Sequence, residues 1–360
     1  MRIAVTGMGG RTGQGILRAL RQGVPEAWIL GLDASPMAPG LYGCDAAALV
    51  PMAREEEAFL EALLSLVERH RIQLLLPGLD PELPLLARHR ARFESLGCRV
   101  VVSDPGIVAT CQDKLACYQW LAAEEEPFVA TWALDELLKS ERTAFPLFLK
   151  PMKGSGSKFL QVAFTKPDLW SVQDPGAYVA QAFLLPVGWG IPSVKELKPA
   201  HVWKNGQLRQ EDDLSVQGLL DESGELVALA VLLKEFFAGM SVKAVPFRHE
   251  EVEAVSASIF RRMGRRGARG SCNLQGRLTA EGFRVYELNP RMSGATAIRA
   301  ALGFNECRAV VDLWLGGLSV EEVAPRLRLA EDQICLRYLT ECVVPLARVE
   351  ELRQGGPAAG

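Results

Sequence analysis

Along the first hundred residues, short apolar runs alternate with longer stretches whose apolar positions recur at helical spacing. The apolar runs predict four buried strands, at 2–6, 28–33, 72–76 and 99–103. The stretches between them predict three helices, at 12–21, 55–70 and 81–96. Strands that alternate with helices in this way indicate a parallel sheet with helices on both faces.

After Asp104-Pro105-Gly106, a turn sequence that ends this first unit, hairpin signals replace the alternation. Asn205-Gly206 and Glu222-Ser223-Gly224 each separate two apolar runs, as turns between antiparallel strands do. The other expected strands lie at 145–151, 158–164, 178–184, 269–277, 283–289 and 333–344. The expected helices lie at 113–122, 250–263, 295–302 and 307–315. The terminal GGPAAG predicts a disordered tail.

The composition narrows the class of protein. A chain of 360 residues, 49% of them hydrophobic, is expected to form two or three packed units. The formal net charge of −3 gives no electrostatic reason to expect nucleic acid or an anionic membrane as partner. No apolar run is long enough for a signal peptide or a membrane span. The eight cysteines include no C-x-x-C pair, which disfavours a zinc ribbon or a disulfide framework and favours a reducing cytoplasm.

Two further groups of residues have ordinary explanations. The basic run from Arg261 to Arg266 ends a predicted helix, where cations suit the helix dipole, and it lacks the interleaved aromatic residues of a nucleic-acid surface. The histidines are isolated, and no Ser/His/Asp or Cys/His order indicates nucleophilic catalysis. We therefore expect neither group to be the active site.

The first glycine-rich turn, from Thr6 to Gly13, follows a strand and opens a helix, and Asp33 ends the next strand. This context fits a dinucleotide fingerprint, in which glycines let the backbone approach a pyrophosphate. The same glycines also serve when a helix simply packs closely on a strand. We favour the packing explanation, because the rest of the chain offers a better nucleotide site.

The second glycine-rich segment, from Lys153 to Lys158, joins two apolar strands and lacks the spacing of a P-loop. A Gly/Ser hairpin tip can fold over a triphosphate and donate backbone N–H groups to it. Lys150 interrupts the first of these strands, and a buried cation there needs an anion such as a nucleotide phosphate. The alternative is a mobile surface hairpin with a lysine that reaches solvent.

The segment from Val285 to Arg291 is the most informative. In a strand, Glu287 and Asn289 lie on the same face. Folding the hairpin about Thr279–Gly282 places Gln275 opposite Glu287, so three oxygen donors converge as a hard cation such as Mg²⁺ requires. Arg291 follows directly and can reach a phosphate bound to that metal.

Together these segments resemble the ATP-grasp superfamily, most closely one synthetase half of the carbamoyl phosphate synthetase large subunit and related single-unit carboxylate–amine ligases. The blocks that carry the resemblance are VTGMGG, SDPGIVATCQDKLACYQWL, FPLFLKPMKGSGSK, GARGSCNLQG and ELNPRMSGATAIRAALGFN. The resemblance implies a mixed α/β and α+β fold: a Rossmann-like pre-ATP-grasp domain at 1–105, followed by a two-part ATP-grasp fold. Its small lid part is expected at 106–186, its large metal-bearing part at 187–346, and a tail at 347–360.

The resemblance also assigns roles to individual residues. The ATP-binding residues are Lys114, Lys150, Lys153, Gly154, Ser155, Gly156, Ser157, Gln181, Phe183, Leu184 and Asp213. The metal ligands are Gln275, Glu287 and Asn289, the catalytic residues are Lys150 and Arg291, and the substrate lies at Arg291, Ser293 and Gly294.

Three features depart from the family pattern. Phe159 stands where a glycine commonly follows the phosphate-covering loop, and Gln217 stands where an acid often occurs. The stretch from Trp189 to Gln210 is an insertion between the adenine strand and Asp213, where it adds a substrate lid or an interface.

The activity that the resemblance implies uses ATP and Mg²⁺, which Mn²⁺ can replace. A substrate carboxylate attacks the γ-phosphate, and the acyl phosphate then meets an amine to give an amide. The expected partners are a small-molecule carboxylate and an amine, with no nucleic acid and no membrane, and a homodimer is left open. The alternatives are a bicarbonate- or carbamate-phosphorylating enzyme, an NAD(P)-dependent reductase that uses the first glycine turn, and a non-catalytic nucleotide-binding protein.

Overall fold

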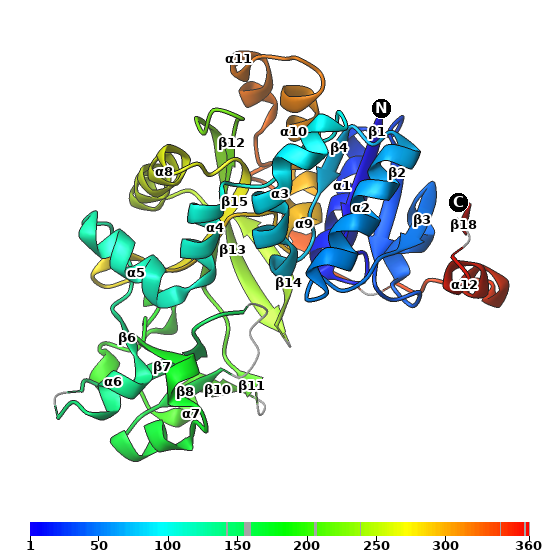
Figure 1. The fold of residues 1–360 in the computed structure, drawn as a ribbon. Helices are drawn as coiled ribbons and strands as arrows, with labels where there is room; N and C mark the ends of the chain where they lie inside the picture. Colours follow the sequence, from blue (N-terminus) through cyan, green and yellow to red (C-terminus); the bar gives the residue numbers. More distant parts are fainter. Residues whose placement is uncertain are drawn as a thin grey trace.

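The computed structural model describes residues 1–141, 143–154, 160–204, 207–237, 239–338, 340–355 and 358–359. Within these residues the strands form two six-stranded sheets, one four-stranded sheet and a two-stranded ribbon. Figure 1 shows the first six-stranded sheet on one side (blue), the four-stranded sheet set apart below (green), and the second six-stranded sheet between them. Across the described ranges, no helix combines the length and apolar character that a bilayer crossing requires.

The first sheet is the predicted parallel sheet. Its parallel strands are β1 (Arg2–Thr6), β2 (Trp28–Asp33), β3 (Ala46–Leu49), β4 (Leu74–Leu76) and β5 (Arg99–Val100), in the order β3-β2-β1-β4-β5. Helices α2 (Glu56–His70) and α3 (Leu83–Ser95) share a core with one face, and α1 (Arg11–Gly23) packs on the other. Helices on both faces explain why these strands read as continuous apolar runs.

Helices from the far end of the chain complete the α1 side of this sheet. α1 packs against α9 (Thr296–Ala301) and α10 (Glu306–Trp314). The Asn305 amide donates to the carbonyl of Ala19 at 2.8 Å, and Arg308 donates to the carbonyl of Gly23 at 2.7 Å. The loop that precedes α9 lies against the other end of α1, where a Cβ added at Gly294 would lie 3.6 Å from the Cβ of Arg11.

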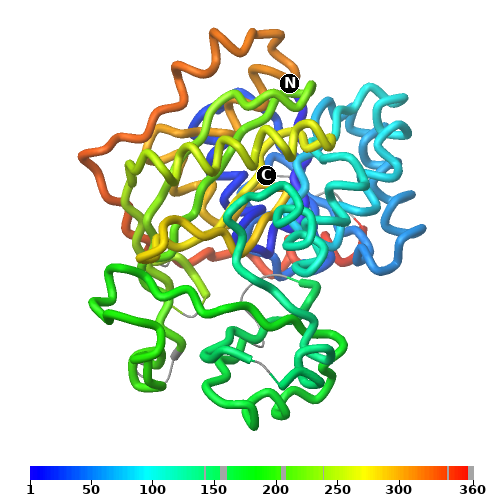
Figure 2. Tube along the Cα trace, turned by 90° about the vertical axis from the view of Figure 1, so that its left-hand side faces the viewer, coloured from blue at the N-terminus to red at the C-terminus, as the bar shows by residue number. Residues whose placement is uncertain are grey.

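The four-stranded sheet is antiparallel, in the order β6-β9-β7-β8. Its strands are β6 (Thr131–Ala133), β7 (Leu147–Pro151), β8 (Gln161–Ala163) and β9 (Tyr178–Ala182), and α6 (Leu134–Leu138) contacts β9. Figure 2 shows this part of the chain (green) below the rest of the molecule. The β7–β8 hairpin carries the second glycine-rich segment, as predicted. The ribbon of β10 (Trp203–Lys204) and β11 (Gln207–Leu208) pairs around Asn205-Gly206, which lie outside the described residues.

The second six-stranded sheet has the order β16-β15-β12-β13-β14-β17 and is antiparallel throughout. Its strands are β12 (Asp213–Leu220), β13 (Leu226–Phe237), β14 (Met240–Pro246), β15 (Gly270–Thr279), β16 (Gly282–Asn289) and β17 (Cys335–Leu336). Helices α4 (Pro105–Gln112), α5 (Lys114–Ala123) and α8 (Glu250–Arg265) share a core with one face. Strand alternation puts Cys272 and Leu274 in that core and Asn273, Gln275 and Arg277 on the opposite face.

The structure corrects the prediction for the end of the chain. The strand predicted at 333–344 is wrong except for the two residues of β17, because Ile334, Leu336 and Val343 are exposed and little of the segment pairs with a sheet. The tail was predicted to be disordered, but Ala358–Ala359 (β18) pair with β3. The sequence analysis also missed β3, α4 and α12 (Leu346–Arg353), which are short.

The first glycine turn makes a backbone contact that tolerates no side chain. A Cβ added at Gly13 would lie 2.3 Å from the carbonyl oxygen of Gly7, which is fixed backbone. We predict that Gly13→Ala lowers the free energy of unfolding by about 2 kcal/mol or more, because overpacking against backbone forces strand and helix apart. Urea unfolding of both proteins measures the change.

Gly106→Ala is the matched control, since a Cβ there meets nothing within 4 Å. Alanine inside α4 should leave stability unchanged or raise it by up to about 1 kcal/mol. A Gly13→Ala protein as stable as the Gly106→Ala protein would contradict the packing role of the first glycine turn.

Candidate active site

A cleft of about 530 Å³ lies where the three larger sheets meet. It brings together most of the predicted site residues: Lys114, Lys150, Lys153, Gly154, Gln181, Leu184, Asp213, Gln275, Glu287, Arg291, Ser293 and Gly294. Asn289 lines a smaller adjoining cavity of about 170 Å³ that shares Glu287 with the cleft. Phe183 does not line the cleft, and Ser155, Gly156 and Ser157 lie outside the described residues.

The β15–β16 hairpin places the predicted metal ligands as the sequence indicated. Gln275 is the cross-strand partner of Glu287, and Asn273 is the partner of Asn289. The Asn289 amide donates to the Glu287 carboxylate at 2.9 Å, so both side chains do lie on one face. The amide oxygen of Gln275 lies 3.1 Å from the Tyr286 hydroxyl, whose single proton it shares with Asp213.

These three side chains fit a magnesium ion that also binds phosphate. Mg²⁺ in nucleotide sites takes one or two carboxylates and completes its shell with phosphate oxygens and water. Glu287 supplies the carboxylate, and Gln275 and Asn289 supply amide oxygens. Within the described part of the chain, no three His, Cys, Asp or Glu side chains gather into an alternative metal site.

Lys150 lines the cleft, and its positively charged side chain is buried. Its side chain is on β7, and its ammonium nitrogen lies 4.4 Å from the centre of the Tyr286 ring and 4.9 Å from that of Phe148. Burial lowers the pKa of Lys150 to about 8, against the opposing effect of the Glu287 carboxylate. The burial of this ammonium group supports the prediction that an anion binds beside it, and that prediction stays untested.

Two more lysines flank the base of the β7–β8 hairpin. The Lys114 ammonium donates to the carbonyl of Gly154 at 2.9 Å, and the backbone N–H of Lys114 donates to Met152 at 3.1 Å. Lys153 forms an isolated β-bridge with Asp113, whose carboxylate caps α5. The start of α5 thus anchors the residues from Met152 to Gly154, where the glycine-rich segment begins, beside the cleft.

Arg291 is held by a residue that the sequence analysis did not single out. Its guanidinium forms a two-point ion pair with Asp80, with nitrogen–oxygen distances of 2.5 and 2.7 Å. Burial alone would lower the pKa of Arg291, but the Asp80 carboxylate more than offsets this and raises it. Asp80 begins the short 3-10 helix η2 (Asp80–Glu82) after β4, 211 residues away in sequence, so no local pattern could reveal the pair.

Asp213, predicted to bind ribose, lies in a buried network. Arg277 donates to its two oxygens at 2.9 and 3.3 Å, and the Tyr286 hydroxyl donates to it at 3.1 Å. Arg277 and Tyr286 were not predicted as site residues. The position of the charged Arg277 within a core strand was a signal in the sequence that could have indicated it. The network ties β12 to the metal-bearing hairpin, and the ribose role of Asp213 stays a prediction.

The predicted adenine strand is β9 and the residues after it. The Gln181 amide nitrogen donates to Thr131 at 3.1 Å, while its oxygen is buried with no hydrogen-bond partner among the described residues. The carbonyl of Leu184 accepts from Arg277 at 3.0 Å. Phe183 instead packs with Trp189, Leu197 and Val202 of the insertion, in an apolar cluster outside the cleft.

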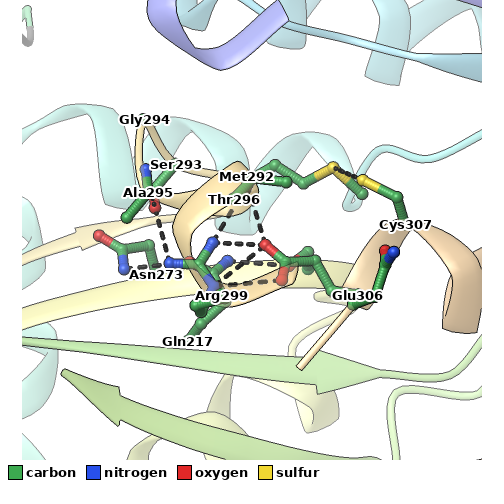
Figure 3. A network of polar contacts seen from close by, with 12 residues as sticks. Gln217, Asn273, Met292, Ser293, Gly294, Ala295, Thr296, Arg299, Glu306 and Cys307 are labelled. Carbon is green, nitrogen blue, oxygen red and sulfur yellow. Dashed lines mark hydrogen bonds and ion pairs between the residues drawn. The ribbon is translucent and has the colours of Figure 1, made fainter. Parts of the chain in front are cut away.

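The loop with Ser293 and Gly294 is fixed by the buried ion pair of Arg299 and Glu306. Both side chains are fully buried, and Arg299 also donates to the Ser293 hydroxyl at 3.1 Å (Figure 3). Gln217, which replaces an acid expected by resemblance, donates to the carbonyl of Arg291 at 3.3 Å. The loop with Arg291, Ser293 and Gly294 is therefore held in place by hydrogen bonds from Arg299 and Gln217.

The sequence features set aside earlier have structural roles. In the basic run, Arg262 pairs with Glu126 at 2.6 Å and Arg266 lies over the Trp120 ring at 4.7 Å. At the first glycine turn, the Gly9 N–H donates to Asp33 at 2.7 Å. Asp33 thus bonds the turn itself, in keeping with a packing role.

Residues 3–101 match the sequence model of a family described as PylC-like, N-terminal domain. No curated protein matches the chain. Among solved structures, the chain is similar to N5-carboxyaminoimidazole ribonucleotide synthetase from Thermus thermophilus, with a TM-score of 0.63 and 16% identity over 91% of this chain and 80% of that one. It is also similar to L-amino acid ligase from Bacillus licheniformis, with a TM-score of 0.64 and 13% identity over 91% and 77%.

The chain has the ATP-grasp fold. A third structure with this likeness is the biotin carboxylase domain of 2-oxoglutarate carboxylase from Hydrogenobacter thermophilus, with a TM-score of 0.63 and 11% identity over 91% of this chain and 72% of that one. That structure holds MgADP, ADP and bicarbonate. At such identities the likeness establishes the fold, and the chemistry has to come from the residues of the cleft.

The lowered pKa of Lys150 makes the stability of the ligand-free protein depend on pH. Below pH 8 the folded protein carries a buried charge that the unfolded chain holds in water. Between about pH 8 and 10.4 the folded state loses that proton first, so stability rises with pH across this window. We predict that Lys150→Met is more stable than wild type at pH 7, by about 3 kcal/mol at most, and that the gap narrows by about pH 9.5.

Urea unfolding at both pH values measures the gap, and Lys139→Met at an exposed position is the control. The control should match wild type at both. A gap between wild type and Lys150→Met that stays constant or widens with pH would contradict the buried, charged state assigned to Lys150.

Proposed function

We propose that the chain is an ATP-dependent ligase that phosphorylates a carboxylate and joins the resulting acyl group to an amine. The observation that carries this proposal is that Glu287 and Gln275 line a cleft that also holds the buried cation of Lys150, while Asn289 is hydrogen-bonded to Glu287 from the adjoining cavity. Oxygen ligands beside cations are what a magnesium–triphosphate complex requires.

In this proposal ATP lies along the cleft, with its adenine beside β9 and its phosphates under the β7–β8 hairpin. Gln275, Glu287 and Asn289 hold Mg²⁺, which supplies charge neutralisation on the phosphate oxygens. Lys150 and Lys114 bind the β- and γ-phosphates, and Lys153 with Gly154 to Ser157 covers them. Because phosphoryl transfer depends on positioning and electrostatic stabilisation, no nucleophilic side chain is needed.

The substrate carboxylate attacks the γ-phosphate beside Ser293 and Gly294, with ADP as leaving group. An amine then attacks the acyl carbon of the acyl phosphate, and phosphate leaves. The four-stranded sheet is the element that can close over the cleft and keep water from the acyl phosphate. The Arg291 guanidinium is paired with Asp80. It neutralises charge on the transferred phosphoryl group by binding that group and Asp80 together.

Several finer points belong to the same proposal. We place the domain boundaries at residues 105, 186 and 346. We expect the metal site to accept Mn²⁺ as well as Mg²⁺ and the protein to act in the cytoplasm. A homodimer is the assembly to test first. Phosphorylation of bicarbonate instead of a larger acid is the second candidate, since a neighbour with this fold holds bicarbonate together with ADP.

Glu287→Gln tests the proposal, because it keeps size and hydrogen-bonding capacity and removes the only carboxylate from the metal site. We predict that ADP release stimulated by acid and amine falls by about a hundredfold or more, since a phosphate-bound metal is worth several kcal/mol of transition-state stabilisation. The melting temperature should change little, because Glu287 faces the cleft. A coupled assay of ADP release over a panel of amino acids, with thermal melts, gives both readings.

Glu281→Gln is the matched control, on the same hairpin but with a side chain 85% exposed. It should retain wild-type activity. A Glu287→Gln protein that melts normally and releases ADP as fast as the Glu281→Gln protein would refute the proposed metal site.

A further inference from the structure

The end of the cleft beyond Ser293 contains three cations, Lys234, Arg337 and Arg11, which we call the distal cations. They come from β13, from the segment after β17, and from the first residue of α1. None of the three was a predicted site residue, and none of them belongs to the proposed ATP site.

Lys234 is the most deeply placed of the three. Its side chain is only 5% exposed. Among the described residues its ammonium group has no hydrogen bond and no ion pair, and it lies 4.7 Å from the centre of the Phe236 ring. Asp213 is its cross-strand partner, but that carboxylate is already bonded by Arg277 and Tyr286.

The two arginines are also without carboxylate partners in the part of the chain that the structure describes. Arg337 donates to the carbonyl of Gly294 at 2.7 Å, and Arg11 donates to that of Gly239 at 2.7 Å. A guanidinium has five N–H donors in a fixed plane, so the one bond to a carbonyl sets the direction of the others. Burial lowers the pKa of Arg337, and the nearby positive charge of Arg11 lowers it further.

Two other arginines that line the cleft, and one buried beneath it, do have carboxylate partners. Arg291 pairs with Asp80, Arg277 with Asp213, and Arg299 with Glu306. The start of α1 adds the positive end of a helix dipole, with no acidic residue in its first turn. The distal end of the cleft therefore carries positive charge that no ion pair neutralises within the described ranges of the chain.

A buried, unpaired ammonium is costly, and fold stability alone gives no reason to keep it. We propose that the distal cations bind a second anionic group of the acid substrate, a carboxylate or a phosphate separate from the carboxylate that is activated. This inference rests on the proposed function, since it places the reacting carboxylate at Ser293 and Gly294. It makes the substrate a dianionic small acid.

The position of Lys234 in the sheet separates it from the proposed metal site. Glu287 and Gln275 lie on β16 and β15, at one edge of the order β16-β15-β12-β13-β14-β17. Lys234 lies on β13, beyond Asp213 on β12, and Arg337 follows β17 at the other edge. An acid that spans from Gly294 toward Lys234 therefore points away from the metal ligands and toward the distal cations.

The test uses the full chain saturated with MgADP, so that phosphate-binding groups of the nucleotide site are occupied. The probes are glutarate, its monoamide glutaramate, and inorganic phosphate, all at the same ionic strength. Calorimetry and melting temperature are the readings. Glutarate and phosphate should bind and raise the melting temperature, and glutaramate should bind about tenfold more weakly or worse, because it lacks the second charge.

Lys234→Met and Arg337→Gln should each abolish the preference for glutarate over glutaramate while leaving MgADP affinity unchanged. Lys243→Met, on the neighbouring strand with an exposed side chain, should behave as wild type. If one of the two variants fails to fold, the other still tests whether the distal cations bind the second anion.

Equal response to glutarate and glutaramate in wild type, or an unchanged preference in both variants, would overturn the inference. So would a loss of MgADP affinity in Lys234→Met, which would assign that lysine to the nucleotide. If wild type does not bind MgADP, the proposed function fails, and the same comparison without nucleotide still decides whether the distal cations select a second anion.

Discussion

This cleft depends on the burial of two lysines, Lys150 and Lys234, that form no ion pair with any residue that the structure describes. Lys150 and Lys234 are both more than nine-tenths buried, and burial lowers their pKa values to about 8 and about 7. Removing an ammonium group from water costs several kcal/mol unless an anion meets it. A protein that keeps two such groups along one cleft gains from them only when an anionic ligand is bound.

The scaffold around these cations is correspondingly rigid. The Arg299–Glu306 pair fixes the loop with Ser293 and Gly294, and the Asp213–Arg277–Tyr286 network joins β12 to the β15–β16 hairpin. Truncating one member of such a buried pair would leave the other uncompensated, so these pairs resist single substitutions. These networks order one side of the cleft, and Lys150 reaches the cleft from β7 of the four-stranded sheet.

The sequence was enough to predict what local pattern determines. The parallel sheet followed from alternating strands and helices, and the pairing of Gln275 with Glu287 followed from one turn and a period of two. Long-range charge pairing was out of reach, as with Arg291 and Asp80, because nothing in the neighbourhood of either residue indicates the other. β17 was overestimated for a related reason: whether an apolar run forms a strand depends on a partner edge that the run itself does not encode. Lys234 lay in an apolar run, as Lys150 did, but only the structure places it in the cleft.

The central claim is that the cleft binds ATP through a metal held by the β15–β16 hairpin. Calorimetric titration of ATP into the full chain, with magnesium and then with the metal removed by chelation, tests it most directly. The account predicts strong binding with Mg²⁺ and binding weaker by about tenfold or more without it, since the phosphates then lose their link to Glu287. Equal affinity for ATP in the two conditions, or no binding in either, would contradict it.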